Sequence, residues 1–139
     1  MEKLSLILDT SFLIALNSAK DINHNDSQAL KSRLEDKEFG QVYISDYIFD
    51  EFVTFLMAKS FPVAYIKKMG DSLLGEGSIK LLKIDVNIFM QSWELFKKSN
   101  KLSFTDCTTI VLAKEFGIKN VASFDSDFDK IPHIKKLPK

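Results

Sequence analysis

Four acidic side chains stand at positions from which they could converge on one site. Asp9 directly follows the first apolar run, and Asp125 comes two residues after the segment 120–123. Glu51 flanks the apolar stripe of one amphipathic segment, and Asp106 lies in a segment that is apolar nearly all round. Oxygen ligands of this kind select Mg²⁺ or Mn²⁺. Such an ion can activate water and stabilise a leaving oxygen, so the sequence predicts phosphoryl chemistry.

Each acid also has an interpretation that involves no metal. Asp9 and Asp125 could be capping or turn aspartates, and Glu51 could be a boundary residue that reaches out to water. Ser103 and Asp106 fit the S-x-x-D pattern of a capping box at a helix start. A capping role does not exclude metal ligation, so both interpretations stay open for Asp106.

Apolar runs alternate along the chain with segments of helical spacing. Ser45, Asp85 and Ser103 are suitable N-caps, and Gly117 is a suitable end for the last helix. Strands are predicted at 4–8, 42–44, 79–84 and 120–123, with a short fifth from Ile134, and helices from Thr10 and over 25–38, 45–59, 62–75, 85–98 and 103–117.

This alternation predicts an α/β fold with three α/β/α layers around a central, mainly parallel sheet of four to five strands. Residues 1–139 are expected to form a single domain. Ligands in such folds bind at the carboxyl ends of the strands, which is the edge where Asp9 and Asp125 are expected.

The composition narrows the function classes. Lysine plus arginine balance aspartate plus glutamate at 19 each, so any polyanion must be held by a local patch. Arg33 is the single arginine, which favours point-charge phosphate contacts over bidentate readout of bases. The lone Cys107 predicts a protein of the reducing cytoplasm, and no apolar stretch predicts a membrane span.

Other candidate sites fail on residue type. The segment 125–136 begins like a calcium-binding EF-hand loop, but Lys130 and Lys136 occupy the positions of its glycine and its bidentate glutamate. One cysteine and two distant histidines cannot assemble a zinc site. Lysine clusters at 67–68, 97–101 and 135–139 are expected to be solvated faces, although together they could hold a phosphate backbone.

Four segments together resemble the PIN domains, and among them the VapC-like toxins of toxin–antitoxin pairs. The resemblance spans nearly the whole chain. Its pieces are 8–14 after the first strand, 50–52 on the third helix, 102–106 at the start of the late helix and 122–128 after the fourth strand.

The resemblance implies a metal-dependent endoribonuclease whose Mg²⁺ or Mn²⁺ ions are held by acidic side chains. It carries these roles to Asp9, Glu51, Asp106 and Asp125, with Asp127 as an alternative fourth ligand. Ser11 is implied as a polar contact, and Ser123 replaces the threonine that is usual in the family. An RNA substrate, a homodimer and a cognate antitoxin protein are implied as well.

Three other functions compete with this hypothesis. A non-catalytic PIN-like domain could bind RNA or act as a scaffold after losing its metal, although the intact set of acids argues against it. A PIN nuclease of RNA processing is a second alternative. An aspartyl phosphatase of the haloacid-dehalogenase type would need an aspartate at position 11, which is Ser11.

Overall fold

Five parallel strands form the sheet on which the rest of the chain is arranged. The computed structural model describes residues 4–75 and 77–138. The sheet has the order β3-β2-β1-β4-β5, and every neighbouring pair is parallel, which confirms the predicted sheet. The strands are β1 (Ser5–Leu8), β2 (Gln41–Ser45), β3 (Ile79–Leu82), β4 (Asn120–Ala122) and β5 (Lys135–Leu137).

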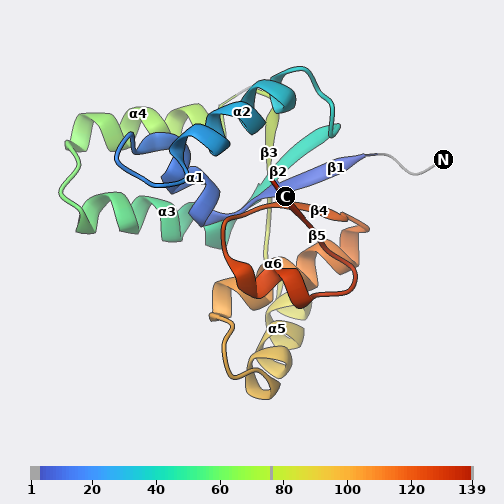
Figure 1. The fold of residues 1–139 in the computed structure, drawn as a ribbon. Coiled ribbons are helices and arrows are strands. Elements are labelled where there is room, and N and C mark those ends of the chain that lie inside the picture. Colours follow the sequence, from blue (N-terminus) through green and yellow to red (C-terminus); the bar gives the residue numbers. More distant parts are fainter. Residues whose placement is uncertain (1–3, 76, 139) are drawn as a thin grey trace.

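Helices cover both faces of this sheet and complete the predicted three layers. Figure 1 shows α1 to α4 gathered on one side of the sheet and α5 with α6 on the other. Right-handed crossovers require this division, because the chain moves outward from β1 to β3 and then returns past β1 to β4 and β5. The helices are α1 (Thr10–Asn17), α2 (His24–Glu35), α3 (Asp46–Ala58), α4 (Val63–Leu74), α5 (Val86–Lys98), α6 (Phe104–Phe116) and the 3₁₀ helix η1 (Ser126–Lys130).

The core lies on both sides of the central strand. Leu6, Ile7 and Leu8 of β1 are all buried, and successive strand side chains point to opposite faces. Phe52 of α3 and Leu112 of α6 are also fully buried. Each such side chain contributes about 1.5–3 kcal/mol by leaving water, which holds the elements that carry the acids in fixed places.

Helix α6 is the most deeply buried helix segment near the acids. Its side chains from Asp106 to Ala113 are all buried. Ser103 caps its start, and Gly117 ends it in the left-handed conformation at φ +66°, as the sequence predicts. An aspartate in the first turn of this helix is therefore forced into the interior of the molecule.

Several boundaries differ from those predicted. The predicted helix over 25–38 ends at Glu35, because Lys37 adopts a positive φ of 58° that a helix cannot accommodate. The third strand ends at Leu82 instead of at residue 84. The 3₁₀ helix Ser126–Lys130 was not predicted, and it turns the chain back toward α6 after Asp125. Among the described residues, no helix has the length and apolar character needed to cross a membrane.

The strand order places a ligand crevice beside β1. The crossovers from β1 and from β4 leave on opposite sides of the sheet, so the helices diverge beyond the ends of these two neighbours. In open α/β sheets, ligands bind at such a switch point. Asp9 follows β1 directly, and Ser123 follows β4 directly.

Candidate metal centre

Asp9 is a buried carboxylate held by two hydroxyl groups. Its residue is 3% exposed, and it stands at the start of α1 without making a side-chain capping bond. Instead, Ser123 Oγ donates to Asp9 Oδ2 at 2.8 Å, and Ser11 Oγ lies 3.0 Å from the same oxygen. Burial raises the pKa of Asp9, and these two hydrogen bonds oppose part of that rise. The capping interpretation of Asp9 is therefore wrong for its side chain.

Ser123 joins the two strand ends at this point. Its hydroxyl accepts the backbone N–H of Asp125 at 3.0 Å while it donates to Asp9. Ser11 accepts the N–H of Phe124 at 2.9 Å, and the two hydroxyl oxygens are 3.1 Å apart. The residues predicted as supporting contacts thus fix the loop after β4 against the start of α1.

Asp106 combines a capping role with a position that faces the other acids. Ser103 Oγ accepts the Asp106 N–H, and Asp106 Oδ2 accepts the Ser103 N–H at 3.3 Å, which completes the predicted capping box. The pKa of Asp106 is raised to about 7, first by burial and then by the negative charges of Asp9 and Asp125. The capping bonds with Ser103 lower this pKa, so burial, with the crowding of carboxylates second, outweighs them.

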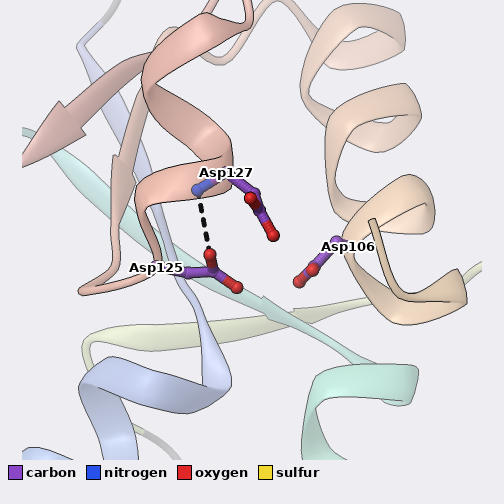
Figure 2. Close-up of side chains that lie close together, drawn as sticks. All are labelled: Asp106, Asp125 and Asp127. Carbon is purple, nitrogen blue, oxygen red and sulfur yellow. Dashed lines mark hydrogen bonds between the residues drawn. The ribbon is translucent and has the colours of Figure 1, made fainter. Parts of the chain in front are cut away.

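Three carboxylates converge at the mouth of this crevice. Asp106, Asp125 and Asp127 each offer an oxygen, and these oxygens all lie within 4.8 Å of one another. Figure 2 shows Asp106 pointing from α6 toward the two aspartates at the start of η1. Asp125 Oδ1 also accepts the Asp127 N–H at 2.9 Å, so the turn interpretation of Asp125 holds alongside its place in the trio.

Asp127 enters the trio because of the 3₁₀ helix. Asp125 is the N-cap residue of η1 and Asp127 lies in its first turn, and Figure 2 shows both side chains close to Asp106. The sequence left the choice between Asp125 and Asp127 open. The structure brings both of them to Asp106.

All five acids line one hollow of about 410 Å³. Asp9 and Glu51 lie outside the trio, and the half-buried Glu51 reaches the hollow from α3. Asp9 and Glu51 line the same hollow, and the negative charge of Glu51 is the smallest contribution to the raised pKa of Asp9. The hollow is lined by Asp9, Thr10, Ser11, Ile14, Glu51, Phe55, Lys101, Ser103, Asp106, Asp125 and Asp127.

Thr10 is a lining residue that the sequence did not single out. Its Oγ1 is buried and has no hydrogen-bond partner within residues 4–75 and 77–138. In the sequence, its position directly after Asp9 was the feature that could have indicated that Thr10 lines the site. Cys107, by contrast, lies in the core, where burial and the neighbouring Asp106 raise its thiol pKa to about 11, as expected of an unreactive cysteine.

The donor set fits a hard divalent cation. Every member of the trio offers carboxylate oxygen, and the raised pKa values of Asp9 and Asp106 show that the acids repel one another and are poorly solvated. A divalent cation relieves both penalties at once because it neutralises charge and replaces lost water contacts. Among the described residues that line this hollow there is no cysteine or histidine, the ligands that zinc favours.

The fold and this site together define an α/β protein with a carboxylate cluster at the switch point of a parallel sheet. The chain belongs to the PIN domain family, whose model matches residues 6–134. This confirms the family to which the motifs pointed.

Curated proteins similar to this chain are named VapC. The chain is 27% identical over 128 residues to a VapC ribonuclease of Archaeoglobus fulgidus, covering 90% of this chain and 80% of that protein. It is 24% identical over 135 residues to the 23S rRNA-specific endonuclease VapC20 of Mycobacterium tuberculosis, covering 96% and 98%.

Solved structures agree with this placement. The crystal structure of Mycobacterium tuberculosis VapC20, a sarcin-ricin loop cleaving toxin, superimposes with a TM-score of 0.76 over 89% of this chain and 92% of that one, at 24% identity. DNA-bound VapBC from Salmonella typhimurium matches with a TM-score of 0.69 at 18% identity, over 96% of each chain. The chain is thus VapC-like in sequence and in fold.

Proposed function

We propose that this protein is a metal-dependent endoribonuclease that hydrolyses RNA phosphodiester bonds. The observation that carries the proposal is the trio Asp106, Asp125 and Asp127, whose oxygens gather within 4.8 Å beside the buried Asp9. The VapC ribonuclease and the VapC20 endonuclease support RNA as the substrate class, since both are similar to this chain over most of its length.

The acids are proposed to hold Mg²⁺ or Mn²⁺. Asp9, Asp106 and Asp125 would be the principal ligands, with Asp127 and Glu51 completing the set. When bound, the metal supplies an activated water molecule and charge neutralisation at the scissile phosphate. Ser11 and Ser123 orient Asp9 by their hydrogen bonds, and Ser103 orients Asp106 through its backbone N–H.

A toxin of a toxin–antitoxin pair is the proposed biological setting. Solved VapBC structures and a toxin–antitoxin complex from Klebsiella pneumoniae, similar to this chain in fold, support a cognate antitoxin as partner. The proposed location is the cytoplasm, which agrees with a single cysteine that is buried and unpaired. A homodimer is proposed from the same family resemblance.

The proposal is tested with purified protein, a mixed RNA pool and Mg²⁺ or Mn²⁺, with EDTA as control. Cleavage that depends on the metal is expected, together with uptake of Mn²⁺ measured by calorimetry. A protein that neither cleaves RNA nor takes up Mn²⁺ would contradict the proposal. That outcome would favour the non-catalytic RNA-binding or scaffold function.

Replacing Ser123 is expected to weaken the site without dismantling the fold. Ser123→Ala removes the hydroxyl that bonds Asp9 and the Asp125 N–H, so Asp9 loses orientation. Mn²⁺ affinity should fall about 10- to 100-fold, as is typical when a partner of a metal ligand is lost. Ser123→Thr keeps the hydroxyl and should retain most of the affinity. Equal losses in both variants would show that volume, and not the hydroxyl, matters here.

The homodimer is expected to use the exposed apolar face of α5. Val86, Met90 and Trp93 follow helical spacing and are 78%, 52% and 44% exposed. Sedimentation should show a dimer for the natural chain, and Met90→Glu should weaken it at least about tenfold by burying a charge. Ile22→Glu is the matched control, since Ile22 is 95% exposed outside this face. A dimer insensitive to Met90→Glu would place the interface elsewhere.

A further inference from the structure

A second hollow opens beside the metal centre and shares part of its wall. It encloses about 490 Å³ between the loop that joins α5 to α6 and the 3₁₀ helix η1. Lys101 and Asp127 line both hollows, so the two are adjacent. The second hollow is lined by Ser99, Asn100, Lys101, Leu102, Ser126, Asp127, Asp129, Lys130 and Ile131.

The charges of this hollow favour an anionic ligand despite its two aspartates. Asp129 is paired with Lys136 at 3.0 Å, and Asp127 belongs to the acidic trio. Lys101 and Lys130 are exposed and make no ion pair within the described part of the chain. The ammonium groups of Lys101 and Lys130 are therefore available in a hollow whose exposed acid, Asp129, is already neutralised.

Lys101 has a position that no other cation shares. Among the described residues that line the metal-centre hollow, it is the only lysine or arginine. Although five acids surround the same hollow, Lys101 forms no ion pair with any of them. Its ammonium group is thus available to a phosphate that reaches both the acids and the second hollow.

Two apolar residues in the lining of the second hollow suit a flat, partly apolar group. Leu102 and Ile131 are half-buried there, and both pack against the core. The exposed residues Asn100 and Ser126 add polar groups to its lining. Proteins that bind single-stranded nucleic acids commonly combine a cationic path for the backbone with a surface that accepts bases.

We propose that the second hollow receives the nucleotide next to the scissile phosphate of the RNA, with Lys101 as the positioning residue that holds the connecting phosphate. The inference rests on the proposed nuclease function. The strand passes from the acidic trio across Lys101, and the flanking base lies against Leu102 and Ile131. Lys130 is placed to contact the phosphate beyond that base.

The inference is tested on RNA binding and on cleavage separately. Binding of a labelled single-stranded RNA is measured in EDTA, and cleavage in Mn²⁺. Lys101→Gln should weaken RNA binding about tenfold, the loss of one charge-assisted contact. It should also reduce the magnitude of the slope of log K for RNA binding against the logarithm of the salt concentration by about 0.7 to 1. Mn²⁺ uptake should be unchanged, and KM should rise more than kcat falls.

Matched variants separate a phosphate contact from a general charge effect. Lys98→Gln removes an exposed lysine at the end of α5, three residues before Lys101, and Lys98 lines neither hollow. This variant should bind RNA as the natural chain does. Lys101→Arg should restore binding because it keeps the charge. Equal effects of Lys98→Gln and Lys101→Gln, or no effect of Lys101→Gln, would overturn the inference.

The proposed binding of the flanking base in the second hollow is tested by determining which bases stand beside the cleavage site. Asn100→Trp adds a large side chain to the lining of the second hollow, so the preferred base beside the cleavage site should change. An unchanged cleavage profile would overturn this part.

The two proposals fail in distinguishable ways. Metal-dependent cleavage that Lys101→Gln does not affect would support the nuclease function. It would reject the proposed course of the RNA across Lys101 into the second hollow. RNA binding that depends on Lys101, with neither cleavage nor Mn²⁺ uptake, would reject the nuclease function and keep the RNA-binding role of Lys101. RNA that is neither bound nor cleaved would overturn both.

Discussion

The Asp106→Asn variant is expected to lose RNA cleavage at least about 100-fold, since the proposed metal supplies several kcal/mol of transition-state stabilisation. Asp106 stands at the centre of the acidic cluster, and its charge interacts with both Asp9 and Asp125. An amide keeps nearly the same volume but offers a single neutral oxygen to a metal. Mn²⁺ uptake should therefore fall together with cleavage.

Without metal, the same variant should be at least as stable as the natural chain. The amide oxygen can still accept the Ser103 N–H, so the capping box is preserved in part. The substitution also removes a carboxylate whose charged form is penalised by burial and by neighbouring acids. Function and stability are thus expected to change in opposite directions, which distinguishes loss of a ligand from loss of the fold.

Asp50→Asn is the matched control for this experiment. Asp50 is exposed on α3, next in sequence to Glu51, and it does not line the hollow. Its replacement should leave cleavage, Mn²⁺ uptake and unfolding unchanged. If Asp106→Asn retained EDTA-sensitive cleavage, Asp106 would not be a metal ligand, and the cluster would have to act through its other members.

The metal-free protein is expected to become less stable as the pH rises from about 4 to about 7. Native Asp106 keeps its proton up to a pKa of about 7, whereas the unfolded carboxyl releases it near 3.8. Between these values the native state binds more protons, so the free energy of unfolding falls with pH and levels off above pH 7. At about 1.4 kcal/mol per pH unit, Asp106 contributes at most about 4 kcal/mol to this change. Asp9 acts in the same direction.

Chemical denaturation in EDTA at several pH values measures this effect. Other acids also titrate in the window, so the informative quantity is the difference between the natural chain and Asp106→Asn. That difference should grow as the pH rises to 7. A difference that is constant with pH would contradict the raised pKa.

Added Mn²⁺ should reverse the trend. The metal competes with protons for the same carboxylates, so its affinity should increase with pH until Asp106 is ionised near pH 7. The metal-bound protein should then be stabilised over the metal-free one most strongly at and above this pH. Thermal unfolding with and without Mn²⁺ at pH 5 and at pH 8 tests this directly.

Local chemistry made much of the fold predictable. Ser45, Asp85 and Ser103 each accept a backbone N–H at the start of the helix they were predicted to cap. The apolar character of β1 predicted a strand covered on both faces, and Asp9 at its end was expected at the ligand-binding edge. These features depend on residues close in sequence, whose geometry neighbouring atoms determine.

Contacts between distant residues decided the rest of the site. The Ser123 hydroxyl bonds Asp9 across 114 positions, and only the pairing of β1 with β4 brings them together. The 3₁₀ helix Ser126–Lys130 brings Asp127 into the trio, although the local residue pattern did not predict it.

The sequence by itself therefore determined which acids could form a site, and the tertiary structure decided how close they come and how strongly they repel. The pKa of Asp106 depends on its burial in α6 and on charges from two other elements, Asp9 and Asp125. Periodicity reports which face of a helix is buried, but it carries no information about which charges face that helix across the crevice.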